Sequence, residues 1–192
     1  MSAFLLIGLG NPGKGYAANR HNIGFMAVDT IAEAYRFSPW KKNFGGLLCE
    51  GAIDGTKILL FKPMGYMNTS GSPAGEAIRF YKIPLENILV IHDELDLPLG
   101  KLRVKKGGGN GGHNGLKSLD ANIGADYWRV RVGIAHPGDK DMVSDYVLSD
   151  FTKAEKKLVQ SMVIEIAKHI GLLFKGDEAG FMNKMTLGMK EV

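Results

Sequence analysis

The sequence predicts an α/β fold, in which a single domain contains a mixed, mostly parallel twisted sheet flanked by helices on both faces. Three observations predict this fold. The length of 192 residues suits one compact domain, short apolar runs interleave with segments of helical periodicity, and one turn signal indicates a β-hairpin. Neither a composition shift nor an internal repeat divides the chain, so residues 1–192 are expected to form one domain.

The N-terminal third is predicted to contain a buried strand, a helix and a hairpin. Residues 4–7 are all apolar, which is typical of a central strand, and the glycines after them mark its end. Apolar residues then recur at helical spacing, which predicts a helix over about 21–37. Two strands are expected next, at about 45–53 and 57–62, because the Asp54-Gly55 dipeptide between them is a strong hairpin signal.

The middle of the chain is predicted to continue this alternation. Ser72 and Pro73 suit the N-cap and first turn of a helix that runs to about Lys82. The apolar run over 88–91 predicts a second core strand. Residues 101–106 alternate basic with apolar side chains, as expected of a strand with one solvent-exposed face.

The last part of the chain is predicted to begin with a glycine-rich loop over 107–112, a short helix and a strand over 128–134. Thr152 and Glu155 then form a capping box, and apolar residues at helical spacing follow it. This pattern predicts a long amphipathic helix. The final segment, 177–192, is only weakly patterned and is expected to be a loose C-terminal tail.

The composition restricts what the protein binds and where it works. The net charge of +4 and the pI of about 9.1 permit a polyanionic partner without requiring one. Cys49 is the single cysteine, so an internal disulfide is impossible and a reducing compartment is expected. Because the sequence shows neither a signal peptide nor an apolar run of the roughly 20 residues that span a bilayer, we expect a soluble, cytoplasmic protein without a membrane partner.

The first glycine-rich segment resembles a nucleotide-binding motif in letters only. A dinucleotide site built on Gly8-x-Gly10-x-x-Gly13 would require a helix to start at once, because the helix N-terminus holds the pyrophosphate. Residues 14–16 continue the loop instead, and Asp29 falls inside the predicted helix. The match is therefore interpreted as coincidental, and no cofactor is expected.

The second glycine-rich segment, 107–112, begins like a Walker A motif. His113 and Asn114 stand where that motif has its lysine and its hydroxyl residue, so the phosphate-binding amine is missing. The glycines are compatible with a flexible turn and equally with a backbone that approaches a substrate closely. The spacing alone leaves both interpretations open.

His21 and Asp93 are candidates for an acid–base pair. Asp93 follows the predicted core strand 88–91, and ligand crevices of open α/β sheets lie beyond the carboxyl ends of such strands. A carboxylate that accepts from the Nδ1–H of a histidine fixes its tautomer and leaves Nε2 as a base near neutral pH. A helix cap or an ion-pair partner is an equally open interpretation of Asp93.

No standard metal or nucleophile motif accompanies this pair. The candidate metal ligands are His92, Asp93, Glu94, Asp96 and His113. They lack the strict spacing of a hydrolytic zinc site such as H-E-x-x-H, so no metal is expected. The G-x-S-x-G elbow is absent, and Cys49 lies in a predicted strand without an obvious base, which disfavours covalent catalysis.

Amide and basic side chains add further candidates. Asn11, Asn68 and Asn114 lie in predicted loops, where an amide can serve a turn or can orient a water and stabilise an oxyanion. Two predicted strands carry basic residues near the second glycine-rich segment, Arg103, Lys105 and Lys106 on one and Arg129 and Arg131 on the other. Such strands are either solvated edges or a surface that binds phosphates.

Taken together, these segments resemble the bacterial peptidyl-tRNA hydrolase family. The matching stretches, in the order of the family, are Gly8-Leu9-Gly10-Asn11-Pro12-Gly13, Tyr16 with Arg20-His21-Asn22, Met67-Asn68-Thr69-Ser70-Gly71, His92-Asp93-Glu94-Leu95-Asp96-Leu97-Pro98, residues 107–115 and Gly133-Ile134-Ala135-His136-Pro137-Gly138. They extend from the first strand to about residue 150. The resemblance implies a carboxylic ester hydrolase that cleaves the bond between a peptide and the 3′-ribose of tRNA, which recycles tRNA after ribosomal drop-off.

The resemblance also implies roles for individual residues. His21 would be the general base that deprotonates the attacking water. Asp93 would orient the His21 ring and favour its positively charged form. The residues implied to hold the peptide backbone, the water and the oxyanion are Asn11, Asn68 and Asn114, those implied to line the site are Tyr16, Met67 and His113, and those implied to meet tRNA phosphates are Arg103, Lys105 and Arg131. The implied partner is the acceptor stem and 3′ end of peptidyl-tRNA. We expect a monomer, because no sustained apolar stripe demands a second copy.

Two positions depart from the family pattern. Many members carry a histidine where this chain has Asn110, which leaves the role of this side chain open. Arg103 stands where lysine is also familiar, so the charge is kept. From the residues alone, a non-catalytic RNA-binding module, a metal-dependent hydrolase and an NAD-dependent oxidoreductase are alternative functions.

Overall fold

The computed structural model describes residues 3–192 and contains one seven-stranded sheet in the order β2-β3-β4-β1-β5-β7-β6. The strands are β1 (Phe4–Gly8), β2 (Lys41–Asn43), β3 (Gly46–Ile53), β4 (Thr56–Pro63), β5 (Ile88–Glu94), β6 (Leu102–Lys106) and β7 (Trp128–Gly133). Strands β4, β1, β5 and β7 pair in parallel, whereas β2, β3 and β6 add antiparallel pairings toward the two edges. The predicted mixed, mostly parallel sheet is thereby confirmed.

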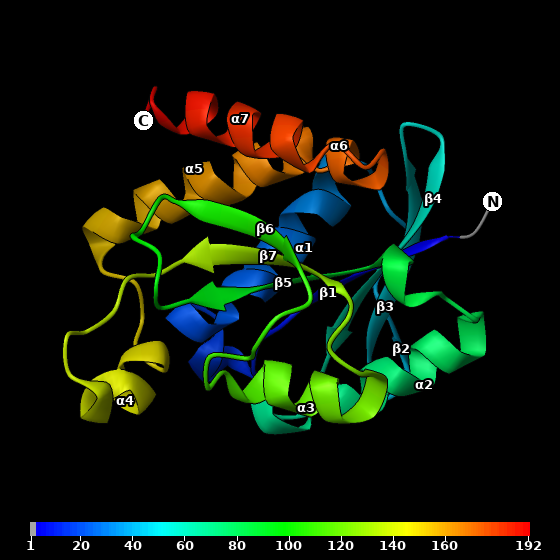
Figure 1. The fold of residues 1–192 in the computed structure, drawn as a ribbon, viewed down its shortest axis with the longest axis horizontal. Coiled ribbons are helices and arrows are strands. Elements are labelled where there is room, and N and C mark those ends of the chain that lie inside the picture. The colour runs from blue at the N-terminus through cyan, green and yellow to red at the C-terminus, as the bar shows by residue number, and fades with distance from the viewer. Residues whose placement is uncertain (1–2) are drawn as a thin grey trace.

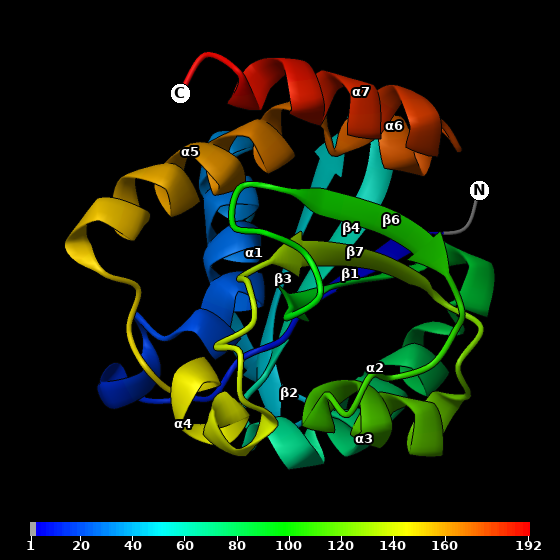
Figure 2. The ribbon, with the colours of Figure 1, turned by 60° about the vertical axis from the view of Figure 1, so that its left-hand side comes forward.

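Helices cover both faces of this sheet (Figure 1). The α-helices are α1 (Ile23–Ala34), α2 (Gly71–Tyr81), α3 (Asn114–Ile123), α4 (Val143–Val147), α5 (Lys153–His169), α6 (Gly171–Phe174) and α7 (Glu178–Met189), and the short 3-10 turns are η1 (Lys14–Tyr16), η2 (Arg20–Asn22), η3 (Met67–Thr69), η4 (Leu85–Asn87) and η5 (Lys140–Met142). Figure 2 shows α5 and α7 on one side of the sheet and α2 and α3 on the other. Across residues 3–192, no helix has the length and apolar character that crossing a membrane requires.

The central strand β1 contributes side chains to two separate cores. Leu5, Leu6 and Ile7 are all fully buried. Leu6 belongs to the larger core, which α1, α5, α6 and α7 cover, while Leu5 and Ile7 belong to the core beneath α2 and α3. A strand that is buried on both faces must be apolar at every position, which explains the uninterrupted apolar run in the sequence.

Two local predictions are confirmed by the backbone. Asp54 and Gly55 have φ angles of 51° and 79°, as a two-residue turn with both central residues in the left-handed region requires, and they connect antiparallel β3 and β4. The Thr152 side chain accepts from the Glu155 backbone, and the Glu155 side chain accepts from the Thr152 backbone, so the capping box forms at the start of α5.

Several predicted boundaries are wrong by a few residues. The helix expected over 21–37 is the turn η2 followed by α1, which ends at Ala34. Helix α2 begins at Gly71, so Ser72 lies in its first turn and is not its N-cap. Strand β5 continues to Glu94, so Asp93 belongs to the strand and does not follow its end. In each case contacts with neighbouring elements extend or shorten a segment whose local pattern is ambiguous.

The expectation of a loose tail over 177–192 is wrong for most of that segment. Residues Glu178–Met189 form α7, which Asp177 caps by accepting from the Gly180 backbone N–H at 2.9 Å. Phe181 and Met185 are buried and pack into the core beside α5. Their spacing of four residues is helical, but polar residues and glycines dilute the pattern around them. Helix α7 therefore depends on its tertiary contacts for stability.

Candidate active site

Close backbone packing brings the start of α1 over the carboxyl ends of β1 and β5. A Cβ atom on Gly8 would overlap the backbone of Gly24, and one on Gly24 would overlap the backbone oxygen of Ile91. Only glycine at these positions lets the helix approach the strands so closely. Gly8, the first glycine of the nucleotide-like fingerprint, therefore serves helix–strand packing, and it places the η2 turn with His21 above β5.

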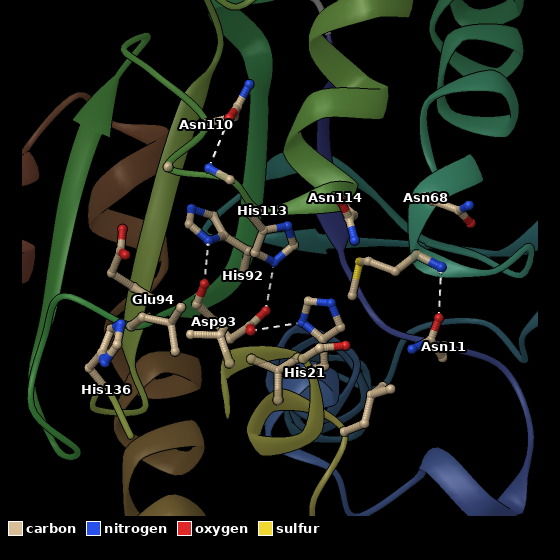
Figure 3. Close-up of a pocket in the computed structure, with 18 of the residues that line it drawn as sticks. Asn11, His21, Asn68, His92, Asp93, Glu94, Asn110, His113, Asn114 and His136 are labelled. Carbon is tan, nitrogen blue, oxygen red and sulfur yellow. Dashed lines mark hydrogen bonds and ion pairs between the residues drawn. The ribbon is translucent and has the colours of Figure 1, made fainter. Parts of the chain in front are cut away.

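The Asp93 carboxylate accepts hydrogen bonds from two histidines. His21 Nδ1 lies 2.8 Å from Asp93 Oδ2, and His113 Nε2 lies 2.7 Å from Asp93 Oδ1. The three side chains come from η2, from β5 and from the residue that precedes α3, and at most 9% of each is exposed. Figure 3 shows the two imidazole rings converging on the carboxylate from different elements. This arrangement brings together the two residues that the sequence suggested as an acid–base pair.

The cap of α3 determines which nitrogen of His113 carries the proton. His113 Nδ1 accepts from the backbone N–H groups of Gly115 and Leu116 at 3.1 and 3.3 Å, so it must be unprotonated. The proton of the neutral ring is therefore on Nε2 and is donated to Asp93. The remaining carboxylate oxygen accepts the Nδ1–H of His21, which leaves His21 Nε2 with a lone pair that can act as a base.

Asp93 is held in its ionised form. Burial alone would raise the pKa of this carboxyl, but the charges and hydrogen bonds of His113 and His21 outweigh burial and keep the pKa well below its usual range. The carboxylate is therefore charged throughout the neutral pH range. It can stabilise a positive charge that develops on the His21 ring.

These side chains form part of the wall of a cavity of about 690 Å³. The residues singled out in the sequence that line it are Asn11, Tyr16, His21, Met67, Asn68, His92, Asp93, Glu94, Asp96, Asn110, His113 and Asn114. Residues to which the sequence assigned no individual role also line it, namely Tyr66, Leu95, His136, Lys140, Val143, Ser144, Val147 and Leu148. Most of this second group lies in the segment from His136 through η5 and α4. Its side chains show no catalytic pattern in the sequence, although Leu148 and Tyr66 are exposed apolar residues of the kind that line ligand sites.

Asn22 fixes the loop that carries Asn11. Its side chain accepts from the Asn11 backbone N–H and donates to the Asn11 carbonyl, both at 2.9 Å. The Asn11 side-chain oxygen accepts from the Met67 backbone at 2.7 Å, and its amide nitrogen, with no acceptor in residues 3–192, remains a donor for a ligand. The role of Asn22 was not predicted from the sequence, although its position beside His21 in a matching stretch was a signal.

The other two predicted asparagines, Asn68 and Asn114, both line the cavity and are both exposed. Figure 3 shows the Asn114 side chain pointing from the start of α3 toward His21, whereas Asn68 lies farther from His21. Met67 is buried and Asn68 is exposed. The structure thus places Asn114 nearer to the histidine pair than Asn68.

Arg20 ties the α4 wall of the cavity to the His21 turn. Its buried guanidinium donates to Ser149 Oγ at 3.0 Å and to Glu155 Oε1 at 2.7 Å, and it lies 4.4 Å from the centre of the Tyr146 ring. These contacts join residues more than 120 positions apart in the sequence. Nothing in the sequence indicated this connection, because a buried arginine cannot be distinguished from a surface one by its neighbours in the chain.

The second glycine-rich segment is both a turn and part of the cavity wall. Asn110 accepts from the Gly112 backbone at 3.0 Å, and residues 110–112 line the cavity. The first backbone N–H groups of α3 are occupied by His113, so this helix start does not offer the anion site that a Walker motif would have. The turn interpretation is therefore confirmed, with Asn110 bonded within the loop itself, while a close approach of this backbone to a substrate stays a prediction.

The predicted basic strands divide into a buried and an exposed part. Arg129 is 2% exposed, donates to the Gly109 carbonyl at 2.8 Å and pairs with Asp120 at 3.3 Å. Its interpretation as a phosphate ligand is therefore wrong. Arg103 and Lys105 are exposed on β6, and Arg131, with a quarter of its side chain exposed, pairs with Glu94. None of these last three basic residues lines the cavity, so they form a separate surface next to it.

The candidate metal ligands do not combine into a convincing metal site. Atoms of His21, Asp93 and His113 that can bind metals lie within 4.8 Å of one another. However, a metal on His113 Nε2 would require the ring proton to move to Nδ1, where it would oppose the two backbone N–H groups of the α3 cap. Glu94 is paired with Arg131, and Asp96 is exposed. The hydrogen bonds thus favour protons over a metal in this cluster.

His92 is buried in a neutral form beneath the site. Its Nδ1 donates to the Asp93 carbonyl at 2.8 Å, while its buried Nε2 has no hydrogen-bond partner in residues 3–192. Burial, followed by the proximity of His113, lowers the pKa of His92 to about 4. An unfolded histidine titrates near pH ~6.5.

We predict that this difference makes the protein less stable in mild acid. Because the folded protein binds the His92 proton more weakly than the unfolded chain, the stability is complete above pH ~6.5 and is lost as the pH falls toward 4. Between pH 7 and 4.5 the loss amounts to roughly 2–3 kcal/mol. Urea unfolding of the wild type and of His92→Asn at both pH values measures it. Equal losses in the two proteins would contradict the prediction.

Comparison with known proteins adds an independent line of evidence. The chain matches the family model described as peptidyl-tRNA hydrolase over residues 5–191. It is 56% identical to a peptidyl-tRNA hydrolase of Azorhizobium caulinodans over 96% of this chain and 90% of that one. A peptidyl-tRNA hydrolase of Bartonella henselae is 52% identical over 97% of both chains. The crystal structure of peptidyl-tRNA hydrolase from Acinetobacter baumannii superposes with a TM-score of 0.90 at 40% identity, covering 95% of this chain and 94% of that one.

Proposed function

The chain belongs to the peptidyl-tRNA hydrolase family and hydrolyses peptidyl-tRNA, and we propose that it does so with a water molecule activated by His21 and Asp93. The observation that carries this proposal is the pair of hydrogen bonds that Asp93 accepts from His21 and His113 at 2.8 and 2.7 Å. With His113 locked by the α3 cap, Asp93 holds His21 in the one tautomer that leaves Nε2 unprotonated. A base of this kind at a cavity wall suits hydrolysis of an ester.

In the proposed reaction, His21 Nε2 removes a proton as the water oxygen attacks the ester carbonyl. The imidazolium that forms is stabilised by ionised Asp93, in the way a carboxylate supports the histidine of other hydrolases. When the tetrahedral intermediate collapses, the same proton passes from Nε2 to the 3′-oxygen of the ribose as its bond to the acyl carbon breaks. The products are the free peptide carboxylate and tRNA.

Amide groups around the cavity supply the polar contacts of this proposal. The Asn11 amide nitrogen is left as a donor, and the Asn114 side chain points toward His21 (Figure 3). We assign to them the carbonyl oxygen of the substrate and the attacking water. Asn68, with Tyr16 and Met67, lines the part of the cavity that we assign to the peptide. A preorganised donor to a developing oxyanion contributes on the order of 10²–10³-fold to the rate of an acyl transfer.

The basic surface beside the cavity is assigned to the tRNA. Arg103 and Lys105 are exposed on β6, and Arg131 lies across the ladder from Arg103. Positive side chains that reach no base edge bind a nucleic-acid backbone without reading its sequence. We therefore assign these three residues to phosphates near the acceptor end. A monomer that works in the cytoplasm, without metal or cofactor, completes the proposal.

Metal independence is tested directly with N-blocked aminoacyl-tRNA as the substrate. We expect free tRNA to be released at the same rate with and without 1,10-phenanthroline, because a metal would have to displace the ring protons through which His21 Nδ1 and His113 Nε2 bind Asp93. The 1,7 isomer, which does not chelate, is the matched control. Inhibition by the 1,10 isomer alone, reversed by added zinc, would establish a metal-dependent hydrolase. Release of no tRNA in any sample would indicate a module that only binds RNA.

A further inference from the structure

Two arginines face each other across the β6–β7 ladder. Arg103 is the register partner of Arg131, and Lys105 is the register partner of buried Arg129. Like charges directly opposite one another destabilise a sheet unless a counter-charge is present. Within residues 3–192, Arg103 forms no ion pair, and Arg131 has a single carboxylate partner, Glu94.

Glu94 binds Arg131 by one particular nitrogen. Its Oε1 accepts from Arg131 Nε at 2.8 Å, and its Oε2 accepts from the Asp96 backbone N–H at 3.3 Å. The carboxylate is therefore held at both oxygens, and it holds the guanidinium through its inner edge. The two terminal nitrogens of Arg131 have no acceptor within residues 3–192, so the outer edge of the guanidinium is left for a ligand.

We propose that Glu94 is a positioning residue that aims the outer edge of Arg131, together with Arg103, at one phosphate of the bound tRNA. The proposal rests on the proposed function, because it takes the tRNA backbone as the ligand of this surface. Planar guanidinium groups bind phosphate oxygens through two parallel N–H donors, so their orientation decides the strength of the contact. An unrestrained arginine loses conformational entropy when it binds a ligand. Because Glu94 already holds Arg131 in one orientation, less of this entropy is lost on binding.

In this role an acidic residue, Glu94, favours the binding of a polyanion, the tRNA. If Glu94 acted only through its charge, its removal would strengthen tRNA binding by reducing repulsion. If Glu94 acted only on its neighbour Asp93, its removal would slow the reaction of every substrate. Positioning predicts a third pattern, in which binding of tRNA weakens while turnover is preserved.

The experiment compares Glu94→Ala and Glu94→Gln on two substrates, full-length N-blocked aminoacyl-tRNA and N-blocked aminoacyl-adenosine, which has no acceptor-stem phosphates. We expect Glu94→Ala to raise KM for the full-length substrate by roughly five- to tenfold, the effect of one lost hydrogen bond to a charged group, with kcat unchanged. For the short substrate neither constant should change. Glu94→Gln keeps one oxygen, which can accept from Arg131 Nε while the longer, exposed bond to the Asp96 backbone at 3.3 Å is given up, so it should restore most of the affinity.

The matched control is Asp126→Ala. Asp126 is exposed beside Gly107 at the end of β6 and forms no ion pair within residues 3–192, so its removal should leave KM unchanged or lower it. A lower KM for both Glu94 variants, an equally impaired Glu94→Gln, or a slower reaction of the short substrate would each overturn the positioning role.

Arg103→Ala and Arg131→Ala separate this inference from the proposed function. If both raise KM for the full-length substrate and Glu94→Ala does not, the inference fails while the phosphate contact stands. If neither arginine variant changes KM, the phosphate assignment itself fails.

Discussion

Replacing His21 with alanine is expected to lower kcat for N-blocked aminoacyl-tRNA by roughly 10²–10⁴-fold, the usual contribution of a general base. The reason is geometric, because His21 Nε2 is the unprotonated nitrogen that stays free in the Asp93 cluster, whereas the unprotonated His113 Nδ1 already accepts from two backbone N–H groups. KM should change little, since the surface assigned to tRNA lies on β6 and β7 and not on η2. Release of tRNA under saturating and limiting substrate separates the two constants.

His169→Ala is a matched control for this variant. His169 also pairs with a carboxylate, Glu165, at 3.2 Å, but it lies on α5 and does not line the cavity. We expect its activity to equal that of the wild type. An activity of His21→Ala within a few-fold of the wild type would remove His21 from the role of base.

Asp93→Asn is expected to lower kcat by on the order of 10³–10⁴-fold, as observed when the analogous carboxylate of a serine-protease triad is amidated. An asparagine has one oxygen, but two ring N–H groups seek an acceptor at this position. His113 cannot change its tautomer without opposing the backbone N–H groups of Gly115 and Leu116. The asparagine oxygen therefore turns to His113, and its amide group donates to His21 Nδ1. His21 must then carry its proton on Nε2, where it no longer acts as a base.

This explanation predicts a partial rescue by a second substitution. In Asp93→Asn with His113→Asn, the new residue 113 can still cap α3, because asparagine is a favourable N-cap, but it is too short to reach residue 93. The oxygen of Asn at 93 is then available to His21 Nδ1–H. We expect the double variant to be at least ~10-fold more active than Asp93→Asn, in proportion to the regained tautomer. His113→Asn alone provides the reference.

A double variant that is no more active than Asp93→Asn would show that the tautomer is not the cause of the loss. In that case the negative charge of Asp93 would be the property that the reaction needs.

Much of the fold and part of the site followed from short-range sequence patterns. The run before Gly8 indicated a central strand because both faces of β1 are buried, and the Asp54-Gly55 turn indicated a hairpin because glycine and aspartate tolerate the left-handed backbone it needs. The pairing of His21 with Asp93 was one hypothesis from the residues, and the family resemblance made it specific. These features depend on a residue and its near neighbours in the chain.

The partners of individual side chains were decided by the tertiary structure alone. Arg129 and Arg131 lie two positions apart on one strand, yet the first is buried against Asp120 and the second is only partly buried beside Glu94. Helix α7 forms where the local pattern is weak, because Phe181 and Met185 find a core to enter. His113 caps α3 and at the same time donates to a strand 20 residues earlier. Sequence periodicity reports which face of an element is buried, whereas burial of a charge or the tautomer of a ring depends on groups that folding brings together.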